Sequence, residues 1–122
     1  MRGSGVVAWA DTDASGWIHH TAAFRWVEEV EHAFVRSVGV DPGRFPRRTV
    51  SATYDRPLRA GDPYEVDLRV ASLGRTSITW EWTILTGDTA AIEGRHTAIH
   101  VGEEGRPAPL PDALRAALEG ES

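Results

Sequence analysis

The sequence contains no cysteine among its 122 residues. It therefore has no disulfide, no thiolate metal site and no cysteine nucleophile. Lysine is also absent, so all 13 basic residues are arginine, which is typical of a G+C-rich genome and also suits fork-like recognition of phosphate or carboxylate groups. No apolar run approaches the roughly 18 residues of a membrane-spanning helix, and the N-terminal segment lacks the apolar stretch of a secretory signal. We expect no membrane partner and a cytoplasmic location.

Positive charge is scarce, because 13 basic residues face 18 acidic ones and give a net charge of −5. This balance opposes binding to nucleic acid by bulk electrostatic attraction. A content of 41% hydrophobic and 25% charged residues is that of an ordinary globular protein. The length allows one domain, spanning residues 1–122, whose small core would benefit from a partner subunit.

A long amphipathic helix is predicted from about residue 21 to 38. Its apolar residues recur at spacings of three and four, while charged residues, including Glu31, take other positions. Gly39 and Pro42 then favour the end of the helix. The apolar stripe consists of Ala23, Trp26, Val27, Val30, Phe34 and Val38.

Outside this helix the apolar period falls to two, which is typical of strands with one exposed face. The clearest case is 64–70, in which Glu65, Asp67 and Arg69 alternate with apolar residues. Gly94 predicts a bend or break in the last strand. The predicted strands are 6–9, 49–55, 64–70, 77–84 and 89–101, and a short helix is predicted at 112–118.

One helix followed by consecutive antiparallel strands indicates an α+β fold in which the sheet covers the helix. A sheet covered on one side only would leave Trp80 and Trp82 poorly protected. We therefore expect self-association through an edge or a face of the sheet.

The densest group of chemical side chains is 11–20, with sequence Asp-Thr-Asp-Ala-Ser-Gly-Trp-Ile-His-His. Asp, Ser and Gly are also what a tight turn or a helix approach uses, so a purely structural role remains open. The helix that follows begins with unsatisfied N–H groups and a partial positive charge. Backbone donors near His20 and Thr21 could polarise a carbonyl oxygen, with Asp13 close enough to act on the carbon.

These residues resemble the opening of hotdog-fold thioesterases of the 4-hydroxybenzoyl-CoA thioesterase type. The similarity extends in the same order over nearly the whole chain. It continues through Tyr54-Asp55-Arg56-Pro57-Leu58-Arg59-Ala60-Gly61-Asp62, Gly74-Arg75-Thr76-Ser77 and the ending from Gly105-Arg106-Pro107 to Leu110-Pro111. The resemblance implies a hotdog fold, in which a sheet of about five antiparallel strands wraps a long central helix. It also implies a homodimer or a homotetramer with the active site near a subunit interface.

By this resemblance Asp13 is the catalytic carboxylate, as nucleophile or as general base on water, and Asp11 shapes the loop. The backbone amide of His20 polarises the thioester carbonyl, and its side chain matches a histidine implicated in catalysis in the short-chain acyl-CoA thioesterases. The substrate-binding loop would include Trp9, Gly16 and Trp17. Trp9 stands where many relatives carry an aromatic hydroxyl, and Trp17 either caps an acyl pocket or packs against a partner subunit.

The same resemblance assigns the phosphates of coenzyme A to Arg75, Thr76 and Ser77. A second basic cluster, which either binds coenzyme A or an acyl carrier protein or simply keeps the surface hydrated, consists of Arg44, Arg47, Arg48, Arg56 and Arg59. The expected substrate is an acyl-CoA or acyl-carrier-protein thioester, hydrolysed to free acid and thiol without a cofactor.

Metal binding is not expected, because His96 and His100 lie about 13 Å apart along one strand face, too far to bind one zinc ion. His19 and His20 are chain neighbours whose side chains should diverge. A helix carboxylate, Glu28 or Glu29, offers an alternative centre of the hydratase or dehydratase type. A non-catalytic acyl-thioester binding module is the other alternative.

Overall fold

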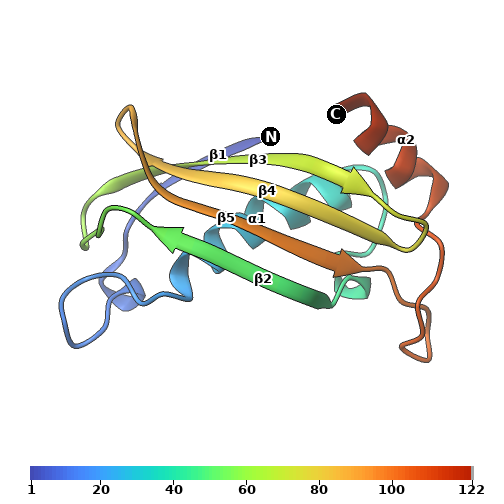
Figure 1. The fold of residues 1–122 in the computed structure, drawn as a ribbon, viewed down its shortest axis with the longest axis horizontal. Coiled ribbons are helices and arrows are strands. Elements are labelled where there is room, and N and C mark those ends of the chain that lie inside the picture. The colour runs from blue at the N-terminus through green and yellow to red at the C-terminus, as the bar shows by residue number, and fades with distance from the viewer. Residues whose placement is uncertain (122) are drawn as a thin grey trace.

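The computed structural model describes residues 1–121, which form a five-stranded antiparallel sheet with a long helix lying across one face (Figure 1). The strand order is β1-β3-β4-β5-β2. This architecture confirms the α+β class, the helix and the five antiparallel strands predicted from the sequence. The elements are β1 (Arg2–Val6), α1 (Ala22–Ser37), β2 (Arg47–Tyr54), β3 (Pro63–Leu73), β4 (Ser77–Thr86), β5 (Thr89–Ile99) and α2 (Asp112–Glu121), with short 3₁₀ turns at Trp9–Asp11 and Pro42–Arg44.

Helix α1 buries the apolar stripe that its sequence period predicts. Trp26, Val27 and Val35 are among its buried residues, and Gly39 follows the helix with a φ of +79°. One buried position is not apolar, because Glu31 also faces the sheet. The assignment of Glu31 to the polar positions is therefore wrong. It stands four residues from both Val27 and Val35, so the helical period itself places it on the buried face.

The inner face of β4 forms the centre of the core. Every second residue, from Ile78 through Trp80 and Trp82 to Ile84, is buried. Both tryptophans are fully covered within the single chain, so the expectation that they would need a partner subunit for protection is wrong. The neighbouring strand β5 continues through Gly94, so the break expected there is absent. Glycine is needed at this position because a Cβ atom would collide with the ring of Trp82.

The first strand lies earlier than predicted. β1 covers Arg2–Val6 and pairs with β3, whereas Trp9–Asp11 forms a 3₁₀ turn. Two glycines lowered the apparent strand propensity of this segment. Gly3 is required there because a Cβ atom would lie 2.5 Å from Cγ2 of Val30, so β1 runs close against α1.

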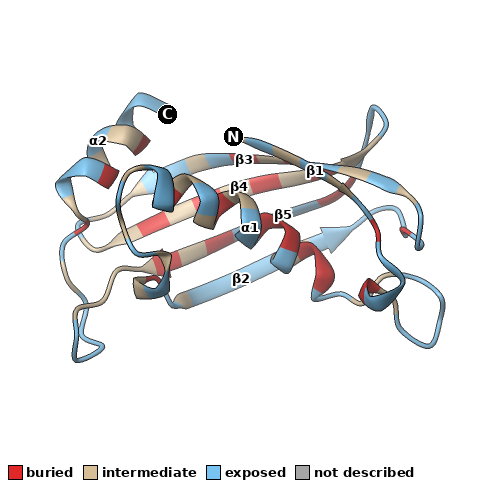
Figure 2. Cartoon of the chain, turned by 180° about the vertical axis from the view of Figure 1, so that it is seen from behind, coloured by how far each residue is buried: buried red, intermediate tan, exposed pale blue. Residues whose placement is uncertain are grey.

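The two edges of the sheet differ in length and exposure. β2 pairs with β5 on one side only, and most of its residues are exposed (Figure 2). Val50 is 54% exposed and Tyr54 is 41% exposed on this edge.

No helix within residues 1–121 is long and apolar enough to cross a membrane.

Candidate active site

The loop between β1 and α1 folds back on itself as a small hairpin. Thr12 and Ile18 form an isolated β-bridge, and the Asp13 amide donates to the Trp17 carbonyl at 3.0 Å. Gly16 closes the turn at a φ of +86° and donates its amide to the Asp13 carbonyl. The hairpin therefore presents Asp13 at its turn, where the side chain is exposed.

The carboxylate of Asp13 is held by one neighbour. Its Oδ1 atom accepts hydrogen bonds from the hydroxyl and the backbone amide of Ser15, the latter at 2.8 Å. These donors hold the pKa of Asp13 below its usual range, and the nearby His19 and His20 act in the same direction. Asp13 is therefore an accessible carboxylate that is ionised at neutral pH.

Asp11 anchors the loop to the helix. It is 9% exposed and accepts hydrogen bonds from the Ala8 amide at 2.9 Å and from Nη2 of Arg25 at 3.0 Å. Its carbonyl oxygen accepts from the His19 amide at 2.7 Å. The side chain and the main chain of Asp11 thus join three segments, which fits the loop-shaping role expected from the sequence.

The start of α1 carries hydrogen-bond donors that the chain does not use. The N-cap residue Thr21 makes no side-chain cap, and its hydroxyl instead contacts Nδ1 of His19 at 2.7 Å. Within residues 1–121, nothing accepts a hydrogen bond from the backbone amide of His20. The Tyr54 hydroxyl donates to the His20 carbonyl, a contact that sequence reasoning missed because it joins the end of β2 to a loop 34 residues earlier.

Two tryptophans lie in or beside the hairpin. Trp9 is 82% exposed, and Trp17 is 37% exposed. Trp17 also forms an isolated β-bridge with Arg59, whose guanidinium carbon lies 4.4 Å from the centre of the Trp17 ring. The structure therefore brings Trp9, Asp13, Gly16, Trp17 and His20 together at one end of the sheet.

The predicted phosphate-binding turn lies at the other end. Gly61 and Asp62 contact Val7 at the start of β3, whereas Arg75 follows the end of β3. A strand of 11 residues separates these points, which corresponds to roughly 33 Å. Helix α2 also holds this turn in place, because Nη2 of Arg115 donates to the Gly74 carbonyl at 2.6 Å. Within one chain, Arg75, Thr76 and Ser77 therefore cannot share a site with Asp13.

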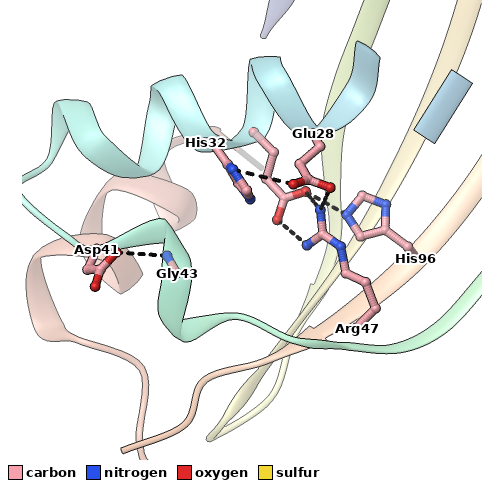
Figure 3. Close-up of polar contacts among 7 residues, drawn as sticks. Glu28, His32, Asp41, Gly43, Arg47 and His96 are labelled. Atoms are coloured by element: carbon pink, nitrogen blue, oxygen red, sulfur yellow. Dashed lines mark hydrogen bonds and ion pairs between the residues drawn. The ribbon is translucent and has the colours of Figure 1, made fainter. Parts of the chain in front are cut away.

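Sequence reasoning missed a buried polar network beneath the sheet (Figure 3). Glu31 is 1% exposed and accepts two hydrogen bonds from Arg47, at 2.7 and 2.8 Å, and one from Nε2 of His96 at 2.8 Å. The indole N–H of Trp82 donates to Nδ1 of His96 at 3.2 Å, which leaves the ring proton on Nε2. The network thus connects α1 with β2, β4 and β5.

The pKa of Glu31 reflects two opposing effects. Burial raises the pKa of this carboxyl group, but the hydrogen bonds from His96 and Arg47 and the charge attraction of Arg47 outweigh burial and hold the pKa below its usual value. Glu31 is therefore an ionised carboxylate whose oxygens already have partners. Without free acceptor capacity or access to solvent, it offers no place for a substrate.

Neither helix glutamate proposed as an alternative centre is enclosed. Both Glu28 and Glu29 are exposed. Glu28 lies 3.7 Å from Nδ1 of His32 and 3.8 Å from Nη2 of Arg47 (Figure 3). Within residues 1–121, no group of three or more His, Asp or Glu side chains is arranged to hold a metal ion.

A surface groove of about 490 Å³ runs between β1 and α1. Trp26 and Tyr64, which stack with ring centres 4.1 Å apart, belong to its walls. Neither Asp13 nor His20 lines this groove. The side chain of Asp13 is instead exposed at the surface of the chain.

Comparison with known proteins places this geometry in context. A family model described as the thioesterase-like superfamily matches residues 7–118. A 1,4-dihydroxy-2-naphthoyl-CoA hydrolase of Prochlorococcus marinus (strain MIT 9313) is 29% identical over 131 aligned positions, covering 93% of this chain and 86% of the relative.

Solved structures show the same fold. A thioesterase of Thermus thermophilus, crystallised with coenzyme A and zinc, superposes with a TM-score of 0.87 at 27% identity and covers 96% of this chain and 95% of its own. A protein of Pseudomonas aeruginosa strain PAO1 reaches a TM-score of 0.91 at 22% identity, covering 100% of this chain and 91% of its own. The second similarity is one of fold alone.

Proposed function

The chain belongs to the thioesterase-like superfamily, and we propose that it hydrolyses an acyl thioester of coenzyme A to a free acid and a thiol, with Asp13 as the reactive carboxylate. Water supplies the oxygen that replaces sulfur at the carbonyl carbon, and the departing sulfur takes up a proton. Asp13 acts either by attacking the carbonyl carbon or as general base on that water. Thioester hydrolysis, the activity expected from the sequence, is supported by this family membership.

One observation carries the proposal: an exposed, ionised carboxylate lies beside unused donors at a helix start. Asp13 keeps an oxygen that no donor within residues 1–121 occupies, because both Ser15 hydrogen bonds go to Oδ1. The His20 amide and the partial positive charge of the α1 N-terminus suit the oxyanion that forms at the carbonyl. The exposed His20 ring provides a second polar group for the substrate or the leaving thiol.

Coenzyme A is the proposed carrier because the similar hydrolase of Prochlorococcus marinus is named for a CoA thioester and the Thermus thermophilus thioesterase was crystallised with coenzyme A. The same hydrolysis applies to an acyl carrier protein, whose acyl group is also a thioester of a pantetheine thiol. The name of the Prochlorococcus protein favours aromatic acyl groups as first probes.

A homodimer through β2 completes the proposed site. Strand β2 spans eight residues, and every second one points its backbone N–H and C=O groups away from β5. Exposed Val50 and Tyr54 add apolar surface for a second copy. Antiparallel β2–β2 pairing reverses the partner, so that its Arg75–Ser77 turn lies toward the same end as Asp13. The phosphate-binding assignment of Arg75, Thr76 and Ser77 would then apply across the interface. A homotetramer would require a further contact face.

The test is release of free thiol from acyl-CoA substrates ranging from acetyl to benzoyl and long-chain groups. Wild type is compared with Asp13→Asn, which keeps the shape of the side chain, after circular dichroism has shown that both are folded. Thiol release that disappears in the variant supports the proposal. Release that is equal in both proteins contradicts the role of Asp13.

Two other outcomes separate the remaining alternatives. Addition of water to an enoyl thioester without thiol release identifies a hydratase. Binding of acyl-CoA without any turnover, unaffected by Asp13→Asn, identifies a binding module. Sedimentation of the wild type measures the oligomeric state, and a charged substitution, Val50→Asp, is expected to weaken a dimer formed through β2.

A further inference from the structure

The segment after β2 forms a wall beside the candidate catalytic loop. Tyr54 donates its hydroxyl to the His20 carbonyl, the Ile18 amide donates to the Leu58 carbonyl at 2.9 Å, and Arg59 bridges to Trp17. Residues 54–59 therefore run antiparallel to residues 17–20. Through this pairing Arg59 lies next to the loop that carries Asp13, although the two residues are far apart in sequence.

Arg59 is held in a defined position without being neutralised. Its guanidinium carbon lies 4.4 Å from the centre of the Trp17 ring, and stacking of this kind orders an otherwise flexible side chain. No carboxylate within residues 1–121 forms an ion pair with it. Asp62, the acidic residue nearby, accepts a hydrogen bond from the Arg59 backbone amide instead. The N–H groups at the guanidinium edge therefore remain available.

Most of the other described arginines form ion pairs with carboxylates. A carboxylate lies within 4.0 Å of each member of a set formed by Arg2, Arg25, Arg47, Arg69, Arg95, Arg106 and Arg115. Arg59 is the described arginine that combines an aromatic platform with a lack of acidic partner. In a chain of net charge −5, attraction of an anion has to come from such local arrangements rather than from the overall field.

We propose that Arg59, stacked on Trp17, binds the phosphate of the 4′-phosphopantetheine arm that coenzyme A and acyl carrier protein share. A planar guanidinium with free N–H groups matches two phosphate oxygens at once. The thiol end of the same arm carries the acyl group whose hydrolysis is assigned to Asp13, so one side chain secures the substrate beside the catalytic loop. This inference rests on the proposed thioesterase function.

Binding of the thiols themselves tests the inference without requiring catalysis. Calorimetry measures the affinities of coenzyme A, 4′-phosphopantetheine and pantetheine for wild type, Arg59→Gln and Arg59→Lys. Loss of one charge-assisted hydrogen-bonding group is expected to weaken binding of the two phosphorylated ligands by about tenfold in Arg59→Gln. Pantetheine, which has no phosphate, should bind equally to all three proteins. Arg59→Lys should recover only part of the loss, since lysine keeps the charge but not the planar fork.

One control variant carries the same change of charge. Arg56 lies in the same wall and is exposed, and no ring within residues 1–121 stacks on its guanidinium. Arg56→Gln is expected to leave the affinity for phosphopantetheine unchanged. The inference is overturned if Arg59→Gln weakens pantetheine as much as phosphopantetheine, if it changes neither, or if Arg56→Gln causes the larger loss.

Kinetics then distinguish the two natural sources of the arm. KM is compared for one acyl group carried by coenzyme A and by an acyl carrier protein, in wild type and Arg59→Gln. A rise in KM for both carriers supports recognition of the shared phosphate, while a rise for neither overturns it. If no thioester is hydrolysed but the calorimetric difference persists, the proposed function fails and the phosphate site stands.

Discussion

The molecule contains two groups of carboxylate, imidazole and guanidinium side chains that differ in nearly every physical respect. In the exposed loop, Asp13 is open to solvent and lies near His20, and the same loop contains Trp17, on which Arg59 stacks. Beneath the sheet, Glu31 is 1% exposed and is fully engaged by Arg47 and His96. The same side-chain types therefore serve different purposes. Groups that react with a substrate need unoccupied hydrogen-bonding positions and access to solvent, whereas buried polar groups need a partner for every hydrogen-bonding position.

The difference extends to how each carboxylate remains ionised. The two donors of Ser15 are the main cause of the lowered pKa of Asp13, whose side chain is exposed to solvent. Burial opposes the ionisation of Glu31, so its lowered pKa depends on the hydrogen bonds of the whole network. Damage to the loop should therefore affect catalysis, and damage to the network should affect stability.

The largest expected effect is found by substituting the carboxylate of each group in turn and comparing the rate of thiol release with the thermal stability. Asp13→Asn should reduce the rate of thiol release by about 10²–10⁴-fold, since a positioned base or nucleophile contributes that much, while the thermal midpoint stays unchanged. Glu31→Gln should keep the rate per folded molecule within a few-fold. Steady-state rates and calorimetric melting of the same two preparations check both statements. A large loss of rate in folded Glu31→Gln would break the distinction.

The second effect is the cost of the buried network. Removing the Glu31 charge leaves Arg47 and His96 facing a neutral amide, and breaking a buried ion pair typically destabilises a protein by about 3–5 kcal/mol. Glu31→Gln retains one acceptor, so we expect about 3 kcal/mol, with Glu31→Leu losing at least as much. Urea unfolding followed by tryptophan fluorescence measures the free energy. A double variant, Glu31→Leu with Arg47→Leu, should recover part of the loss because it leaves no orphaned charge on either partner.

The acid dependence of this stability has a definite sign. The pKa of Glu31 is lower in the folded than in the unfolded chain, so its contribution is complete above the unfolded pKa. The contribution decreases as pH falls through the folded pKa. The stability difference between wild type and Glu31→Gln should therefore be largest near neutral pH and shrink below about pH 4. A difference that stays constant to the acid limit would show that Glu31 titrates normally.

Much of this arrangement could be predicted from the sequence. The period of three and four gave α1, the alternation around Trp80 and Trp82 gave β4, and the family resemblance is confirmed by the family model over residues 7–118. Residues 11–20 also contained the local signals of the loop, because a turn and a helix start use neighbouring residues.

The long-range contacts could not be predicted. Arg47 is 16 residues from Glu31, and His96 is 65, and no periodic signal links three such positions. The roles of Tyr54 and Arg59 likewise depend on a chain segment folding back along the loop. Arg75 was grouped with the loop by resemblance, but the length of β3 separates them within one chain. Periodicity describes single elements, whereas a site is assembled from several.

A smaller effect concerns the pH profile of the loop. In the proposed mechanism Asp13 must be ionised to act, and its lowered pKa is then expected to place the acid limb of kcat/KM below the range of an ordinary aspartate. Ser15→Ala removes the hydroxyl donor, so the pKa should rise and the limb should shift to higher pH with little change of rate at pH 7. Rates from pH 7 down to about pH 2.5, below the usual aspartate pKa, test this, with intrinsic fluorescence at each pH to show that the protein stays folded. An unshifted limb would assign it to another group.

The smallest effect is expected at Glu28, which is exposed like Asp13 but lies beside the buried network of Glu31. It is 48% exposed, 3.8 Å from Nη2 of Arg47, and borders the buried network without closing it. An exposed ion pair of this length contributes about 0–1 kcal/mol, so Glu28→Gln should change the unfolding free energy by less than that and leave thiol release unaltered. Melting curves and rates of this variant beside Glu31→Gln make the comparison. Because a helix carboxylate would be the centre of a hydratase, a large loss of activity in folded Glu28→Gln would favour the helix over the loop as the site of the chemistry, whereas an unaltered rate agrees with the proposed role of Asp13.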